Sequence, residues 1–202
     1  MNAIRIIGGA WKRTPLVVAA VPGLRPTPDR VRETLFNWLG QRLDGISCLD
    51  LFAGSGALGL EALSRGAREV LFVESDRRAL RAIEQTLGRL GEDQVKGRAE
   101  LSSLDAFAAL GRCARLARRY DLVFLDPPYS AGLLAPVWPL LGPVLADEAL
   151  IYVESGTALA DSDLAAIATQ LGGGRSLQLR KRDRAGQVHY HLLVSTVGAS
   201  EV

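Results

Sequence analysis

Four consecutive residues, Asp126-Pro127-Pro128-Tyr129, combine a carboxylate, two rigid prolines and an aromatic ring. They follow a short apolar run at residues 120–125, which is typical of a buried parallel strand. Open α/β sheets bind their ligands at the carboxyl ends of such strands. The prolines fix two φ angles and have no backbone N–H, so we expect a stiff turn that is rich in hydrogen-bond acceptors.

Such a turn could act on the exocyclic amine of a nucleobase, which is a poor nucleophile because its lone pair is delocalised into the ring. The Asp126 carboxylate and the Pro127 carbonyl could both accept its N–H hydrogens and stabilise the positive charge that develops as it attacks a methyl donor. Tyr129 could stack on the base. In this interpretation Asp126, Pro127, Pro128 and Tyr129 are catalytic. The alternative is an aspartate that only ends a strand and caps a Pro-Pro turn.

A second motif is a glycine-rich turn between an expected strand and an expected helix. Gly54, Gly56 and Gly59 fit the pattern G-x-G-x-x-G, and Glu74 stands twenty residues after Gly54, near the distance expected for a carboxylate that binds ribose hydroxyls. A nicotinamide dinucleotide would suit this pattern. So would a turn that is glycine-rich only because the strand and helix pack tightly.

Asp50, at the end of the strand before these glycines, favours a different cofactor. An acid there repels a pyrophosphate but attracts the ammonium of a methionine moiety. S-adenosylmethionine carries that ammonium and no phosphate, so it is the cofactor we predict, without a metal. Asp105 follows the third expected strand and could accept from the adenine amino group, or could be only the acid at a helix start. The predicted cofactor-binding residues are Asp50, Phe52, Ala53, Gly54, Ser55, Gly56, Glu74, Ser75 and Asp105.

Strands and helices must alternate to position these residues. Strands are expected at residues 46–51 and 69–74, within 94–101, and at 120–125 and 150–153, with helices between them. Two further runs, 176–180 and 188–194, flank a turn and predict an antiparallel hairpin. This order predicts an α/β fold with a doubly wound, mostly parallel Rossmann-like sheet and a C-terminal antiparallel hairpin.

The first 43 residues read as an appendage to that sheet. Residues 4–20 predict a β-hairpin bent at Gly8-Gly9, and Thr27 followed by Pro28 predicts the start of a helix, with Thr27 as the N-cap. We therefore expect an N-terminal appendage at residues 1–43 and a cofactor-binding domain at 44–197.

Much of the positive charge lies in this appendage. The whole chain has a net charge of +2, whereas residues 1–42 hold seven basic and two acidic residues. Basic side chains that contact phosphates position a nucleic acid without reading its sequence. We predict that the appendage binds RNA; the alternative is an ordinary solvent-exposed basic surface. The four arginines at 112, 115, 118 and 119 are interpreted as the solvent-exposed face of a helix. The predicted RNA-binding residues are Arg5, Trp11, Lys12, Arg13, Arg25, Arg30 and Arg32.

The composition is that of a globular protein with a core, with 48% hydrophobic and 23% charged residues among 202. Cys48 and Cys113 are far apart and are interpreted as reduced core residues. No run approaches the length of a membrane span, and the amino terminus lacks the pattern of a signal peptide. We therefore expect a cytoplasmic protein with no membrane association.

Several stretches together resemble one bacterial family, whose members methylate guanine N2 in 16S ribosomal RNA and belong to the Rossmann-like S-adenosylmethionine-dependent methyltransferases. The matching stretches are residues 5–9 with Trp11, 23–27, 29–38, 50–66, 126–129 and 149–154. The resemblance implies that Asp50, Gly54, Gly56 and Glu74 bind the cofactor and that residues 126–129 hold the target amine. It also implies that 16S rRNA is the partner. We expect a monomer that acts on this RNA either naked or within an assembled or assembling small ribosomal subunit.

Three other functions stay open from the residues alone. A nicotinamide-dependent oxidoreductase would use the same glycine pattern. A methyltransferase acting on adenine N6 in DNA would use the same Asp-Pro-Pro-Tyr turn. A noncatalytic RNA-binding module is the third alternative, and the acids at positions 50, 74 and 126 argue against it. For Asp126 to reach a base in RNA, that base must be unpaired or flipped.

Overall fold

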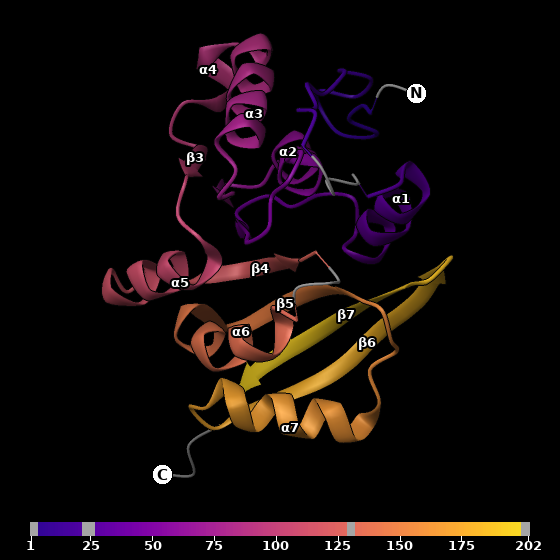
Figure 1. Cartoon of the computed structure of the whole chain (residues 1–202), viewed down its shortest axis with the longest axis vertical. Helices are drawn as coiled ribbons and strands as arrows, with labels where there is room; N and C mark the ends of the chain where they lie inside the picture. Colours follow the sequence, from indigo (N-terminus) through magenta and orange to yellow (C-terminus); the bar gives the residue numbers. More distant parts are fainter. Residues whose placement is uncertain (1–3, 22–26, 129–131, 199–202) are drawn as a thin grey trace. The chain divides into compact units, whose positions relative to one another are not determined.

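The computed structural model describes residues 4–21, 27–128 and 132–198. The chain divides into two compact units, Met1–Ala106 and Phe107–Val202 (Figure 1). Within the first unit, residues 4–43 pack against the segment that follows them, where the backbone N–H groups of Ala10 and Leu43 donate to the carbonyls of Ser64 and Arg65.

The first unit contains three parallel strands, β1 (Ser47–Asp50), β2 (Glu69–Val73) and β3 (Ala99–Ser102), with β2 in the middle. All four residues of β1 are buried, which matches the continuous apolar pattern of a strand covered on both faces. Helix α2 (Ala57–Ser64) connects β1 to β2, and α3 (Arg77–Leu90) and the short α4 (Glu92–Val95) connect β2 to β3. The predicted alternation of strands and helices is confirmed in this unit.

The amino-terminal stretch folds back on itself and packs on α2. Its two arms pair at one antiparallel bridge, Arg5 with Pro15. The backbone N–H groups of Ile6 and Leu16 donate across this bridge to the carbonyls of Thr14 and Ile4 at 2.9 and 2.8 Å, so the predicted hairpin forms as a short one. The backbone N–H of Ala10 donates to the Ser64 carbonyl at 2.7 Å. Gly9 is required at this contact, because a Cβ there would lie 2.0 Å from the Ser64 oxygen and φ is +74°.

Helix α1 (Asp29–Trp38) follows in the same unit and buries Val31, Leu35 and Phe36. The predicted start is displaced by one residue, since Pro28 occupies the N-cap position and makes no side-chain capping bond. Asp29 therefore stands in the first turn, where a negative charge is favourable against the helix dipole.

The second unit contains four strands in the order β4-β5-β7-β6. Strands β4 (Tyr120–Leu125) and β5 (Leu145–Ser155) are parallel, and β7 (Val188–Val197) is antiparallel to both β5 and β6 (Arg175–Ala185). The C-terminal hairpin is confirmed, and β6 extends five residues beyond the predicted run. Its turn contains Gly186 at φ +63°.

Helices cover this second sheet and an aromatic row fills part of its core. Helix α5 (Ala106–Arg115) precedes β4, α6 (Leu134–Leu141) and a 3₁₀ turn (Gly142–Val144) lead into β5, and α7 (Asp161–Leu171) packs on β6 (Figure 1). The rings of Phe124, Tyr152 and Tyr190 follow one another across β4, β5 and β7, with centroids 6.3 Å and 6.4 Å apart. Cys48 and Cys113 are both buried and form no disulfide, as expected for reduced core residues.

Candidate active site

The glycine-rich turn connects the buried end of β1 to α2 and has the geometry that its glycines predict. Gly56 has φ +73°, and a Cβ there would lie 2.9 Å from the Ile83 side chain. At Gly59 a Cβ would lie 2.3 Å from the Phe72 ring on β2. The third glycine therefore allows close helix–strand packing, which is its usual role in this motif. Gly54 also has a positive φ, of 53°.

Asp50 is buried at the end of β1 and is attached to the first turn of α2. Its side chain is 2% exposed, and its Oδ2 accepts a hydrogen bond from the backbone N–H of Gly59 at 3.0 Å. The pKa of Asp50 is raised to about 7, chiefly by burial; the hydrogen bond from the Gly59 N–H opposes the rise, and the nearby charge of Glu74 adds to it. Near neutral pH this carboxyl is therefore balanced between its two protonation states, and a bound cation would favour the ionised state.

Glu74 directly follows β2 and is fixed beside the glycine turn. Its Oε2 accepts from the Gly54 N–H at 2.8 Å, and its Oε1 accepts from the Asp76 N–H at 2.7 Å. Asp76 in turn caps α3, accepting from the Arg78 N–H. The long-range link between Gly54 and Glu74 confirms that the two ends of the sequence motif meet in space.

The other predicted cofactor residues lie along the same edge of the first sheet. Ala53 and Ser55 are buried and Phe52 is half-buried within the turn. Ser75 and Asp105 are exposed, after β2 and β3 respectively. Asp50 ends β1, and Glu74 and Asp105 follow β2 and β3, so all three lie at the carboxyl ends of neighbouring parallel strands.

Asp126 lies in the second unit, directly after β4. It is half-buried, Pro127 is buried and Pro128 is exposed, while Tyr129 lies outside the described residues. Leu125, the last residue of β4, is fully buried and pairs with Val153 on β5. The structure therefore places the predicted acceptors at the carboxyl end of a buried parallel strand.

A second acid, Glu154, stands next to Asp126 and had no predicted role. Asp126 and Glu154 each follow the paired residues Leu125 and Val153, so they occupy neighbouring positions on adjacent strands. Glu154 is 4% exposed, and its Oε1 accepts a hydrogen bond from the Tyr152 hydroxyl at 2.7 Å. An acid at the end of an apolar strand, as at Asp50, is the sequence signal that could have indicated it.

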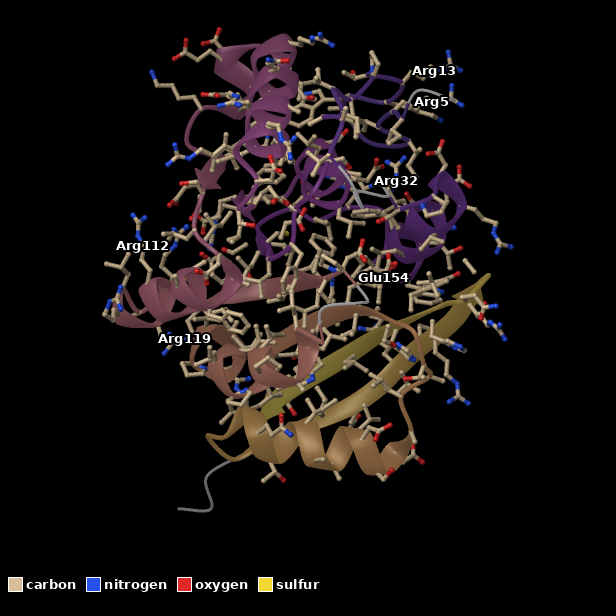
Figure 2. All side chains as sticks on the ribbon, viewed as in Figure 1. Arg5, Arg13, Arg32, Arg112, Arg119 and Glu154 are labelled. Atoms are coloured by element: carbon tan, nitrogen blue, oxygen red, sulfur yellow. The ribbon has the colours of Figure 1, made fainter. Side chains whose placement is uncertain are left out.

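The predicted RNA-binding residues divide into exposed side chains and buried ones. Arg5, Lys12, Arg13 and Arg30 are exposed, and Arg25 lies outside the described residues. Figure 2 labels Arg5 and Arg13 in the amino-terminal stretch and Arg32 in α1.

The structure corrects the prediction for Arg32 and Trp11. Arg32 is fully buried, and its guanidinium donates to the Thr27 carbonyl at 3.2 Å and the Arg5 carbonyl at 3.0 Å. It also pairs with Asp29 at 2.5 Å and lies 3.6 Å from Glu61. Trp11 is 7% exposed and its indole N–H donates to Gln94. The polar atoms of both side chains are used inside the protein, so neither is available to RNA.

The described part of the chain holds neither a membrane-spanning helix nor a cluster of metal-ligand side chains. In residues 4–21, 27–128 and 132–198, no helix is both long and apolar enough to cross a membrane. Within the same ranges, no three His, Cys, Asp or Glu side chains gather as metal ligands would.

A glycine-rich turn between the first strand and its helix, acids after β1 and β2, and Asp-Pro-Pro after β4 are features of a Rossmann-like methyltransferase. Comparison with known proteins specifies this class further. The chain matches the family described as conserved hypothetical protein 95 over residues 4–193, and it belongs to that family.

Three relatives illustrate the similarity. The chain is 49% identical over 154 residues to ribosomal RNA small subunit methyltransferase D of Escherichia coli K12, covering 75% of this chain and 74% of the relative. It is 42% identical over 155 residues to the protein of the same name from Haemophilus influenzae, covering 75% and 78%. The solved structure of yhhF from Escherichia coli is similar with a TM-score of 0.77 and 41% identity, covering 97% of this chain and 99% of that one. The predicted fold class and the resemblance are both confirmed.

Proposed function

We propose that this protein transfers a methyl group from S-adenosylmethionine to the exocyclic N2 amine of a guanine in 16S ribosomal RNA. The observation that carries the proposal is Asp126-Pro127-Pro128 at the end of a buried parallel strand, within a chain 49% identical to a relative named for methylation of small-subunit rRNA. Adenine N6 in DNA and a nicotinamide-dependent oxidation are the alternatives that the experiment below separates.

The residues around the glycine turn fit S-adenosylmethionine. Asp50 is a buried carboxyl whose pKa of about 7 lets it ionise against an ammonium group, and Glu74 offers carboxylate oxygens that suit ribose hydroxyls. A Cβ at Gly56 would meet Ile83, so the turn has no room for a larger residue there. S-adenosylmethionine supplies an electrophilic methyl group. Within the first unit, Asp50, Glu74 and the turn would hold it, with Asp105 toward the adenine.

Asp126 and the Pro127 carbonyl would act on the target amine. Both accept hydrogen bonds, so they can hold the two N–H hydrogens and leave the nitrogen lone pair directed away from the ring. After transfer the nitrogen is cationic and acidic, and it loses a proton to Asp126 or to water. Guanine offers neighbouring donors at N1 and N2, which suits a carboxylate with two acceptor oxygens. Tyr129 would stack on the base.

The amino-terminal residues 1–43 would contact the RNA through the exposed side chains of Arg5, Lys12, Arg13 and Arg30, with Arg25 as a further candidate. Residues 44–197 would form the methyltransferase domain. We also propose a cytoplasmic monomer that acts on an assembled or assembling small ribosomal subunit.

The test is transfer of labelled methyl from S-adenosylmethionine to hypomethylated small ribosomal subunits, naked 16S rRNA and duplex DNA in parallel, followed by nucleoside analysis. N2-methylguanosine in either RNA sample supports the proposal, and a difference between the two samples identifies the substrate. Labelled N6-methyladenine found only in the DNA sample would favour the DNA adenine methyltransferase over the proposed rRNA methyltransferase. No labelled product together with saturable NADH binding would favour the oxidoreductase.

A further inference from the structure

The hairpin formed by β6 and β7 ends in a run of basic residues. Between positions 180 and 184 the chain holds four basic residues and one acid. All four basic side chains are exposed. We refer to Arg180, Lys181, Arg182 and Arg184 as the basic hairpin tip. The pattern of strands in the sequence predicted only residues 176–180 as strand here, so these side chains received no role.

The basic hairpin tip begins at a β-bulge, which follows the buried part of β6. Leu179 pairs with Leu193 whereas Lys181 pairs with Leu192, so Arg180 is an extra residue on its strand. Before the bulge, β6 buries Leu177; after it, residues 181–184 are all exposed. The strand therefore presents charge on both of its faces instead of alternating between core and solvent.

The positive charge of the tip is not neutralised within the described part of the chain. None of its four side chains forms an ion pair with an acid there. The one acid in the run, Asp183, accepts a hydrogen bond from the buried Tyr190 hydroxyl at 2.9 Å. Arg184 donates to the Gly186 carbonyl at 2.6 Å, which holds it over the turn.

The register of the strands places this tip at the same edge of the sheet as Asp126. Leu125 pairs with Val153, Val153 with His191, and His191 with Arg182. One position further, Glu154 pairs with Tyr190 and Tyr190 with Asp183, in the row that Asp126 begins. The tip thus lies three strand spacings from Asp126, about 14 Å. This geometry belongs to the second unit alone, and Figure 1 shows the β6–β7 turn on the side where β4 ends.

We propose that the basic hairpin tip binds phosphates of the RNA strand that flanks the target base. The inference rests on the proposed function, since it assigns the contact to the nucleotides beside a base held at Asp126. Lysine and arginine contacts of this kind hold the substrate in register and weaken steeply with salt. Charge on β6 also has a structural role, because charged edge strands resist pairing with other molecules. That role is served by either sign of charge, whereas phosphate binding requires positive charge.

A charge-matched pair of variants tests the proposal. The first is Arg180→Gln, Lys181→Gln and Arg182→Gln together. The control is Arg112→Gln, Arg115→Gln and Arg119→Gln, which removes three exposed positive charges from the end of α5 and the residue before β4. The control residues lie at the amino end of β4, opposite Asp126, and Figure 2 shows Arg112 and Arg119 away from Glu154.

Binding of in vitro transcribed 16S rRNA is measured at several salt concentrations, together with S-adenosylmethionine binding and methyl transfer. The tip variant should bind RNA about tenfold or more weakly at low salt, and the slope of log K against log salt should fall by about 2, because each lost phosphate contact removes roughly 0.7 to 0.9. Cofactor affinity should not change. The control should keep the slope of the unaltered protein.

Arg182→Glu alone separates the two roles of the charge. It keeps a charged edge strand, so it should not aggregate, yet it should weaken RNA binding. The proposal would be overturned if both tip variants bound RNA with the affinity and salt slope of the unaltered protein. It would also be overturned if the α5 control lost as much RNA affinity as the tip variant. A protein that binds rRNA through the tip but methylates none would instead overturn the proposed function and leave the tip assignment standing.

Discussion

The Oδ2 atom of Asp50 accepts a hydrogen bond at 3.0 Å from the backbone N–H of Gly59, nine residues later. This bond joins the end of β1 to the first turn of α2, so the acid is held at the base of the glycine turn while remaining 2% exposed. A carboxyl that is buried with one neutral donor is costly to ionise. Asp50 therefore lowers stability when it is charged, which is consistent with a role in binding a cation.

Replacing Asp50 with Asn should stabilise the protein without cofactor at pH 8. The folded pKa of about 7 lies above the ordinary value of 3.8. The stability that protonated Asp50 contributes is complete below about pH 4 and is lost as the pH rises through 7, a total of about 4 kcal/mol. Asn keeps an acceptor for the Gly59 N–H and does not ionise, so the advantage of the variant should grow between pH 5.5 and 8 in urea unfolding.

Asp76→Asn is the control for this measurement. Asp76 has its pKa lowered to about 2, chiefly by its side-chain hydrogen bond with Arg78, and asparagine also caps helices well. The difference between this variant and the unaltered protein should stay constant from pH 5.5 to 8. A constant difference for Asp50→Asn as well would show that Asp50 does not titrate in this range.

The affinity for S-adenosylmethionine should rise between pH 6 and 7.5. Ionised Asp50 attracts the ammonium of the cofactor, and the ionised fraction increases as the pH passes about 7. Isothermal titration calorimetry of the unaltered protein should show this increase. Asp50→Asn should bind about tenfold or more weakly and without that pH dependence. Unchanged affinity in the variant would remove Asp50 from the cofactor site.

Substitution of Gly59 by Ala should destabilise the first unit. The new Cβ would lie 2.3 Å from the Phe72 ring, and forcing a methyl group into a packed contact costs about 1–3 kcal/mol. Gly88→Ala provides the opposite case, because no atom lies within 4 Å of its added Cβ in α3 and alanine favours a helix by about 0.5–1 kcal/mol. Denaturant unfolding of the two variants should give shifts of opposite sign. Equal shifts would contradict the packing described for α2 on β2.

Arg32 should matter for stability, whereas its neighbour Arg30 should not. Arg32→Met leaves the carbonyl oxygens of Thr27 and Arg5 without their donor, and each buried acceptor left unsatisfied costs about 1–3 kcal/mol. Glu61 keeps its closer ion pair with Arg65 in this variant. Arg30 is exposed, so Arg30→Met should change the free energy of unfolding by about 0.5 kcal/mol or less. Thermal unfolding distinguishes the two, and a stable Arg32→Met protein with weakened RNA binding would restore the original surface prediction for Arg32.

Local pattern was sufficient to locate the strand ends that carry the candidate site. Asp50 and Glu74 stand at the ends of apolar runs in the first unit, and Asp126 follows one in the second. Parallel strands place such residues at the carboxyl edge of the sheet in their own unit. The meeting of Gly54 with Glu74 follows from the same rule. This is why the contact between the glycine turn and Glu74 was predictable from spacing alone.

Partners distant in sequence explain what the pattern could not predict. Buried Arg32 donates to the Arg5 carbonyl, 27 residues away, and buried Trp11 donates to Gln94, 83 residues away. Neither contact leaves a periodic signal, so both residues were predicted to be on the surface. The end of β6 was also missed, since a charged strand exposed on both faces shows no alternation of apolar residues.

The central claim is that Asp126 presents a guanine N2 amine for methylation, and single-turnover transfer with nucleoside analysis tests it most directly. The unaltered protein and Asp126→Asn would be compared on hypomethylated small ribosomal subunits, with S-adenosylmethionine binding measured for both. We expect N2-methylguanosine from the unaltered protein, and a rate at least about a hundredfold lower in the variant with cofactor affinity unchanged. A different methylated nucleoside, or an undiminished rate in Asp126→Asn, would contradict the account.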